Sequence, residues 1–207
     1  MFVELIDLLR CPLPHEDSWL VLAAVRTEDR HVLDGTLGCP VCRAEYPVHK
    51  GVADLRPPGE HSPPPTFDVP DADEEMVVML AAMAGLSEHG GTVAIGGSLA
   101  NAAAGLESIA NSAVLIINPS AGWAPAASAL RCAGPLPVAP DGLRALVLDD
   151  MTAAAVDLND AVRRVRVGGR IVAPATLSLP DGMRELARDA NWWVAERESP
   201  RIALRRA

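Results

Sequence analysis

Short apolar stretches separated by polar turns make up the first 56 residues. Apolar side chains at positions 2, 5, 6 and 9 recur at helical spacing and predict a short amphipathic helix over Met1–Leu9. Strands are predicted over Trp19–Val25 and His31–Leu37, and Tyr46–Leu55 predicts two strands around a turn at Gly51. The pattern therefore predicts a small β module over residues 1–56.

Residues 57–70 break this pattern. The stretch contains six prolines, which exclude a helix or a central strand and favour extended polyproline conformation. We interpret residues 57–70 as a semi-rigid linker.

Residues 71–207 alternate helical and strand periods, which predicts a mostly parallel, doubly wound sheet. Several strand segments are purely apolar, as expected for strands buried on both faces. Helices are predicted over residues 73–87, 99–110, 156–167 and 183–190. Strands are predicted over residues 92–95, 113–117, 145–148 and 170–174, with a final antiparallel pair over 192–196 and 201–204.

Charge is unevenly distributed along the chain. The formal net charge is −9; residues 1–160 carry 8 Lys/Arg against 22 Asp/Glu, and residues 161–207 carry 10 Arg against 5 acids. An acidic chain disfavours non-specific nucleic-acid binding, although a local basic patch near the C-terminus stays open as an alternative to arginines on solvated faces. No apolar run reaches the ~18 residues of a membrane span, and residues 1–10 do not resemble a signal peptide, so we expect a cytoplasmic protein.

Three of the four cysteines fall within residues 11–42, which favours metal ligation over a disulfide framework. Cys39-x-x-Cys42 is a typical zinc knuckle. The second knuckle would start at Cys11, but Pro14 takes the place of its second cysteine and His15 follows. We predict a Cys₃His zinc site from these residues; the alternative is a ribbon that has lost its metal. Less favoured fourth ligands are His31, His49 and His61.

The order of these motifs resembles a known family. Leu5-x-x-Leu8-Leu9-x-Cys11-Pro12, Cys39-Pro-x-Cys42 and Tyr46-Pro47-Val48-x-x-Gly51-Val52 are similar to the Trm-one-twelve-like family of small zinc-ribbon proteins. The resemblance covers about the first 56 residues. It implies an activating partner of methyltransferases, or a free-standing bacterial protein, and a zinc-ribbon-like fold for this module.

The second domain carries a different resemblance. The strand, glycine and helix unit Thr92–Ser98 includes Gly96 and Gly97, which could let a nucleotide-type cofactor approach a helix N-terminus. Leu136–Leu148 and Val162–Val172 resemble the fourth-strand and fifth-strand regions of class I S-adenosylmethionine-dependent methyltransferases. The implied fold is α/β: a Rossmann-like, mostly parallel sheet with an antiparallel last strand, beside the ribbon module.

The cofactor residues that this resemblance implies are mostly replaced. Val93–Ile95 offer no acid before the glycines, and Asn118 stands where an acid usually binds the ribose. Asparagine lacks the charge that strengthens such a contact. Asp149 and Asp150 end a predicted parallel strand and are candidates for a cofactor contact, or for helix N-caps. The cofactor-binding candidates are thus Gly96, Gly97, Asn118, Asp149 and Asp150.

Three functions follow from these observations. The losses at the cofactor positions favour a non-catalytic binding or scaffolding protein that engages a protein partner or a second copy of itself. The alternative is a divergent S-adenosylmethionine-dependent methyltransferase, with the ribbon as activator. A third hypothesis is nucleic-acid binding through the ribbon and the Arg-rich C-terminus. We identify no catalytic set, since Cys132 lacks a recognisable partner and Ser98, which follows Gly96-Gly97, does not match a nucleophile-elbow pattern.

Overall fold

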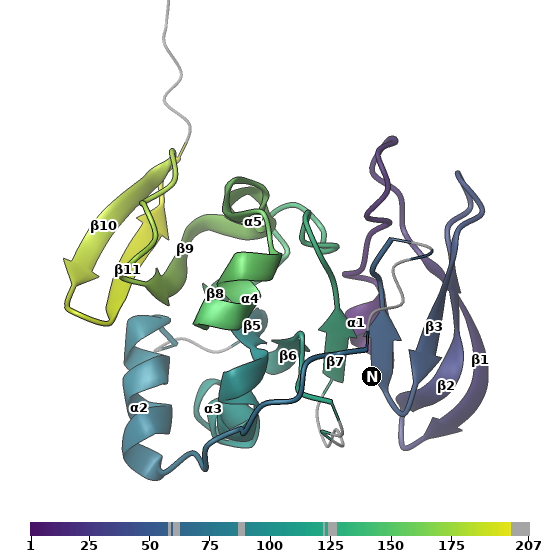
Figure 1. Cartoon of the computed structure of the whole chain (residues 1–207), viewed down its shortest axis with the longest axis horizontal. Coiled ribbons are helices and arrows are strands. Elements are labelled where there is room, and N and C mark those ends of the chain that lie inside the picture. Colours follow the sequence, from purple (N-terminus) through teal and green to yellow (C-terminus); the bar gives the residue numbers. More distant parts are fainter. Residues whose placement is uncertain (58, 60–62, 87–89, 122, 124–127, 200–207) are drawn as a thin grey trace, which may run out of the picture.

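The computed structural model describes the chain except residues 58, 60–62, 87–89, 122, 124–127 and 200–207. Its described strands form one sheet of eleven, in the order β1-β2-β3-β4-β7-β6-β5-β8-β9-β11-β10. The ribbon strands lie at one end of this sheet and the β10–β11 hairpin lies at the other (Figure 1). The fold is therefore mixed α/β with a parallel core, as the sequence predicts.

The N-terminal module is an antiparallel meander, and its predicted strands are confirmed. It comprises α1 (Val3–Ile6), β1 (Val21–Glu28), β2 (His31–Gly38), β3 (Glu45–His49) and β4 (Val52–Asp54). The helix is shorter than predicted. Leu9 instead forms a β-bridge with Val138, and the N–H of Arg10 donates to the carbonyl of Pro137. These contacts join the module to the loop that precedes β8.

β4 connects the ribbon directly to the second half of the chain. It pairs in parallel with β7 (Ser128–Arg131), with Val52 opposite Ala129 and Asp54 opposite Arg131. The sequence places a boundary after residue 56, and the sheet hydrogen bonds continue across it. Because β4 covers β7, the parallel core has no free edge on that side.

The parallel core follows the doubly wound order. Strands β7, β6, β5, β8 and β9 are mutually parallel, and the order of chain entry reverses between β5 and β8. Ligands of such sheets bind outside the carboxyl ends of the strands at this reversal.

Besides β7, the elements from residue 74 on are α2 (Glu74–Met83), β5 (Thr92–Gly96), the 3₁₀ helix η1 (Gly97–Ala102), α3 (Ala103–Ala110), β6 (Ala113–Ile117), β8 (Leu143–Val147), α4 (Asp150–Ala155), α5 (Leu158–Arg164), β9 (Val165–Pro174), β10 (Met183–Arg188) and β11 (Trp192–Arg197).

The last strands correct one prediction. The helix predicted over Met183–Ala190 is wrong, because residues 183–188 form the edge strand β10, paired antiparallel with β11. Pairing with β11, reinforced by the Arg184–Glu196 ion pair, overrides the helix-favouring composition of this segment. β11 is also antiparallel to β9, as the resemblance implies. The final strand predicted over Arg201–Leu204 lies outside the described residues.

Two further differences concern element bounds. The helix predicted over Val156–Val167 covers only Leu158–Arg164, and β9 begins at once with Val165. The sequence pattern predicts no strand between Pro119 and Pro135, but the structure has the short strand β7 there. Its neighbours β4 and β6 supply the hydrogen bonds that define it.

Core residues divide between the two faces of the sheet. Alternate residues of β5 point in opposite directions, so Ala94 belongs to one cluster while Val93 and Ile95 belong to the other. The second cluster is covered by α2 and α3 through Leu80 and Leu106. The first cluster includes α5 and also ribbon side chains, among them Leu9, Leu37 and Tyr46. Within the described residues, no helix is long and apolar enough to cross a bilayer.

Candidate functional site

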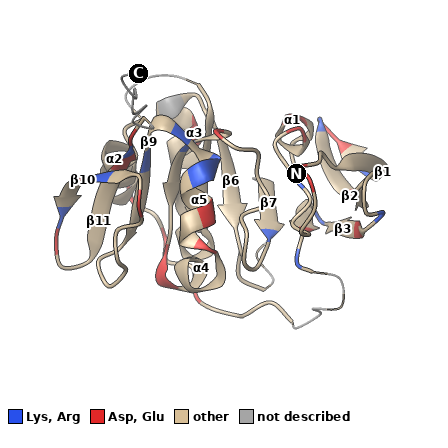
Figure 2. Cartoon of the chain, turned by 90° about the horizontal axis from the view of Figure 1, so that it is seen from above, with Lys and Arg blue, Asp and Glu red and all other residues tan. Residues whose placement is uncertain are grey.

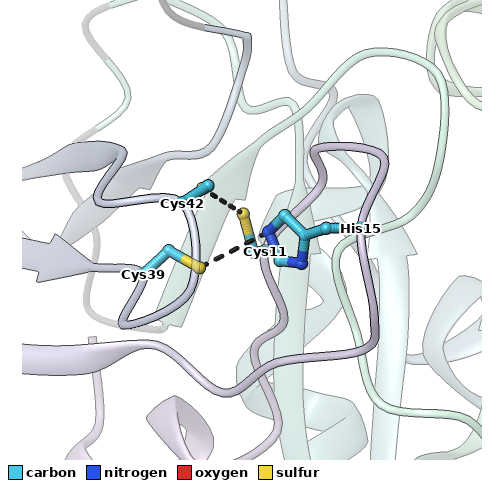
Figure 3. A group of neighbouring side chains, drawn as sticks. All are labelled: Cys11, His15, Cys39 and Cys42. Carbon is cyan, nitrogen blue, oxygen red and sulfur yellow. Dashed lines mark hydrogen bonds between the residues drawn. The ribbon is translucent and has the colours of Figure 1, made fainter.

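The four predicted metal ligands come together at one end of the ribbon. Cys11 and His15 belong to the loop between α1 and β1, and Cys39 and Cys42 belong to the turn between β2 and β3. Figure 3 shows all four side chains pointing toward a common centre. Their ligand atoms all lie within 4.8 Å of one another.

The spacing of these atoms fits a tetrahedral zinc ion. The Cys11 and Cys42 Sγ atoms are 3.7 Å apart, and the Cys39 Sγ atom is 3.5 Å from His15 Nε2. A tetrahedron with Zn–S of about 2.3 Å and Zn–N of about 2.0–2.1 Å has S–S edges of about 3.8 Å and S–N edges of about 3.6 Å. The Cys₃His cluster is therefore compatible with zinc in donor type and spacing.

Neighbouring groups orient two of the ligands. The Nδ1 atom of His15 is 2.6 Å from the carbonyl oxygen of Glu16, a contact that places a proton on Nδ1 and leaves Nε2 as the free lone pair. The Tyr46 hydroxyl lies 3.3 Å from Cys11 Sγ. Tyr46 is buried and belongs to the ribbon core, so it connects the cluster to the packing beneath it.

The backbone of the knuckle favours a thiolate at Cys39. Burial alone would raise the pKa of Cys39, but the backbone N–H groups of Cys42 and Val41 hydrogen-bond the sulfur and lower this pKa to about 6. Burial raises the pKa of Cys11 to about 11 when no cation is present. Because the thiolate is the form that binds metal, Cys39 loses its proton to a metal more readily than Cys11 does.

The alternative ligands lie elsewhere or outside the described structure. His31 packs edge-on against Phe2, with ring centroids 5.1 Å apart, and His49 Nδ1 lies 2.9 Å from an oxygen of Asp34. His61 falls outside the described residues. The cluster found in the described structure contains His15 as its only histidine.

The second candidate site is the glycine turn at the carboxyl end of β5. The N–H of Gly97 donates to Thr152 Oγ1 at 3.4 Å, and the N–H of Ser98 donates to Asp149 Oδ2 at 2.7 Å. The other Asp149 oxygen accepts the N–H of Thr152 at 2.6 Å, so Asp149 is the N-cap of α4. The amides that could hold an anionic cofactor group are thus satisfied by the chain itself.

Close packing fills the space over both glycines. A Cβ added to Gly96 would lie 2.7 Å from the Asp149 carboxylate, and one added to Gly97 would lie 2.2 Å from the Asn118 carbonyl oxygen. The space that a side chain would take at Gly96 or Gly97 is therefore occupied by other atoms of the protein. Asp149 is only 6% exposed.

Asn118 and Asp150 do not join this arrangement directly. Asn118 has a positive φ of 55°, and its Oδ1 accepts the N–H of Cys132 at 2.9 Å, so the side chain is directed toward the end of β7. Asp150 is exposed in the first turn of α4. Of the five predicted cofactor residues, the structure brings together Gly96, Gly97 and Asp149, with the Asn118 backbone against them.

The proline-rich linker also lies along this edge, which the sequence does not indicate. Ser120 Oγ accepts the N–H of Phe67 at 3.0 Å and donates to its carbonyl at 2.7 Å. The N–H of Ala121 donates to the carbonyl of Pro65, and Asn101 Nδ2 donates to the carbonyls of Val69 and Pro70. A cavity of about 180 Å³ remains beneath it, lined by Arg56, Pro64, Pro65, Phe67, Asn118, Arg131, Cys132, Ala133, Met151 and Ala155.

Many arginines of the C-terminal stretch are paired with acids. Acidic and basic residues lie side by side along α5 and the last strands (Figure 2). The described ion pairs are Arg163 and Arg164 with Asp160, Arg164 also with Asp17, Arg184 with Glu196, Arg188 with Glu185, and Arg197 with Asp141. This pairing reduces the positive charge available to a nucleic-acid backbone.

Comparisons with known proteins give distant structural similarity only. No protein-family model matches the chain, and no curated protein matches it. The antibiotic-resistance methyltransferase Kmr is 17% identical over 59% of this chain and 93% of its own, with a TM-score of 0.34. An S-adenosyl-L-methionine methyl transferase from Silicibacter pomeroyi DSS-3 is 10% identical over 61% of this chain and 99% of its own, with a TM-score of 0.26.

Proposed function

We propose that this protein is a non-catalytic binding protein, in which a zinc-stabilised ribbon is built onto a methyltransferase-like sheet with a closed cofactor edge. One observation carries the proposal: the Gly97 and Ser98 amides donate to Thr152 and Asp149, and protein atoms fill the space over both glycines. A cofactor bound there would have to displace these internal hydrogen bonds.

The position of the ribbon supports a structural role for its metal. Cys11, His15, Cys39 and Cys42 would hold zinc, which would fix the loop before β1 against the turn before β3. The same module supplies β4 to the parallel core and buries Tyr46 and Leu37 in the shared cluster. Metal binding would therefore stabilise the edge of the whole sheet as well as the ribbon.

Calorimetric titration of the zinc-loaded full chain with S-adenosylmethionine tests the proposal. We expect no binding at micromolar ligand concentrations. Micromolar affinity, accompanied by loss of the Ser98 amide contact in an amide exchange measurement, would overturn the closed-edge interpretation.

The alternative is a divergent S-adenosylmethionine-dependent methyltransferase, and the cavity beside Asn118 favours it. That cavity lies at the carboxyl ends of β6 and β7, beneath Pro65 and Phe67, where a bound cofactor could extend. If this alternative holds, S-adenosylmethionine binds and Asn118→Ala weakens its affinity. The matched control is Asn159→Ala, because Asn159 lies in α5, away from the cavity lining.

A further inference from the structure

Three arginines surround a small cavity at the amino ends of β8 and β9. Arg144 is the second residue of β8, and Arg166 and Arg170 belong to the first part of β9. The cavity has a volume of about 170 Å³. The residues of its lining that matter here are Arg144, Arg166, Gly168, Gly169, Arg170 and Glu196. The glycine turn after β5 lies at the carboxyl ends of the strands, so this cavity is a separate place on the sheet.

Two of the three guanidinium groups are held in place by backbone carbonyls. Arg144 is only 5% exposed, and it donates to the carbonyl of Gly90 at 3.2 Å and to that of Gly85 at 2.9 Å. Arg170 donates to two carbonyls in the last turn of α2, at 3.1 Å and 3.3 Å. A carbonyl is neutral, so these bonds orient the two side chains without cancelling their charge. The site is therefore preorganised before any ligand arrives.

The lining carries an excess of positive charge. Three arginines and one glutamate give it a formal charge of +2. The glutamate, Glu196, already pairs with Arg184 at 2.8 Å. Within the part of the chain that the structure describes, neither Arg166 nor Arg170 forms an ion pair, whereas several neighbouring arginines do. Cations that gather in a cavity without matching acids indicate a site for an anion.

A bulge in β9 places the third arginine at the mouth of the cavity. β9 pairs with β8 at Val165 and again from Arg170, and the register shifts between these points. Arg166 lies in the intervening segment and is exposed. A Cβ added to Gly169 would lie 2.5 Å from the backbone oxygen of Arg144, so the bulge packs closely against β8. Bulges of this kind redirect side chains, and here the result is one exposed arginine beside two fixed ones.

We propose that this cavity binds a dianionic phosphate group, either free or as the monoester of a small molecule. Guanidinium groups match phosphate oxygens in geometry and bind them through paired hydrogen bonds. A phosphate monoester carries about −1.5 to −2 charges at pH 7, which complements the lining. A volume of about 170 Å³ holds about five or six molecules of liquid water, which is room for a phosphate group.

Other anions suit the site less well. A carboxylate brings a single charge and would leave part of the positive charge uncompensated. A nucleic-acid backbone also brings one charge per phosphate and needs an extended basic surface, but the ion pairs along α5 and β10 reduce the charge around this cavity. The inference goes beyond the proposed function, and it does not depend on whether the cofactor edge is closed.

Calorimetric titration of the zinc-loaded full chain tests the proposal at low ionic strength. Inorganic phosphate and glycerol 3-phosphate are the two probes, and we expect saturable binding to one site. The probe that binds more tightly distinguishes free phosphate from an ester as the ligand. In a parallel nuclear magnetic resonance titration, the amide signals of Gly168 and Gly169 should shift with the same midpoint, because both glycines line the cavity.

Substitutions of Arg166 test the residue assignment. Arg166→Ala should weaken the affinity about tenfold or more, and Arg166→Glu should abolish binding. Because Arg166 is exposed, both variants should keep the circular dichroism of the unaltered chain. The matched control is Arg188→Ala, which removes the same charge from β10, where Arg188 pairs with Glu185 away from the cavity. This control should bind phosphate like the unaltered chain.

Three results would overturn the proposal. The first is a lack of saturable binding by both phosphate and glycerol 3-phosphate. The second is binding that persists undiminished in Arg166→Glu. The third is binding of a single-stranded RNA in the absence of binding by either small probe, which would indicate recognition of a nucleic-acid backbone instead.

Discussion

The Asp149 carboxylate accepts the backbone N–H of Ser98 at 2.7 Å, so a side chain at the end of β8 closes the turn that follows β5. Its second oxygen caps α4 at Thr152. One buried side chain thus satisfies two backbone amides from separate elements, at the position where a doubly wound sheet would accept a ligand.

Asp149→Ala should destabilise the fold. The change removes a helix cap and leaves the partly buried Ser98 amide without its acceptor, which together cost about 2–3 kcal/mol of unfolding free energy. Asp150→Ala, one residue further on and exposed, should change stability by less than about 0.5 kcal/mol. Urea denaturation followed by circular dichroism measures both. Equal effects of the two variants would contradict the role assigned to Asp149.

Metal content should depend on His15 and not on the other ribbon histidines. We expect about one zinc per chain by elemental analysis, and loss of most of it in His15→Ala, because that variant lacks the fourth donor. His49→Ala should keep its zinc, since His49 contacts Asp34 outside the cluster. Undiminished zinc in His15→Ala would show that three cysteines and another donor suffice.

Zinc removal should increase amide hydrogen exchange in β7. Chelation of zinc loosens the ribbon. Because β4 of the ribbon pairs with one edge of β7, the hydrogen bonds on that edge weaken as well. Hydrogen exchange at Ala129 and Leu130 should therefore accelerate about tenfold or more, equivalent to about 1.4 kcal/mol of lost protection. Exchange at Val194 in β11, several strands away, should change much less. A uniform acceleration in both strands would instead indicate global unfolding.

Acid should destabilise the protein through Asp160. Burial would raise the pKa of this carboxyl, but hydrogen bonds from Arg164, Arg163 and the Leu136 N–H lower its pKa overall. Because the folded-state pKa lies below the unfolded value of about 3.9, the group stabilises the fold above about pH 4. That contribution is lost as the pH falls through the folded-state pKa.

Asp160→Asn provides the test of this contribution. The variant should be less stable at neutral pH, and its stability should fall less steeply below about pH 4 than that of the unaltered chain. The exposed Asp181→Asn is the matched control and should follow the unaltered curve. Parallel acid-denaturation curves for Asp160→Asn and the unaltered chain would contradict the assignment.

Local patterns were sufficient where burial decides structure. The purely apolar segments Ala113–Ile117 and Ala145–Leu148 predict interior strands, and both are confirmed as members of the parallel core, the second within β8 (Leu143–Val147). The Cys and His spacing predicts the ribbon cluster, and the structure brings its four residues together. The alternative that Asp149 caps a helix is confirmed as well.

Long-range pairing accounts for what local patterns missed. β10 has a helix-favouring composition and is a strand only because β11 pairs with it. β7 is four residues long and depends on β4 and β6. The hydrogen bonds between the Phe67 backbone and Ser120 Oγ join positions far apart in the chain, and neither residue carries a local sequence signal for that contact. The hydrogen bonds from the Gly97 and Ser98 amides to Thr152 and Asp149 also join distant positions and have no local sequence signal.

The parallel pairing of β4 with β7 also fixes an order of events during synthesis. The ribbon strands are contiguous in sequence, so their hairpins can form early. Val52 of β4, however, pairs with Ala129 of β7, which follows it by 77 positions. Contacts this distant form late, because the loop between them must first lose its freedom. The β4 edge of a nascent chain therefore stays unpaired until β7 emerges, and this interval is when edge-to-edge association with other chains is most favoured.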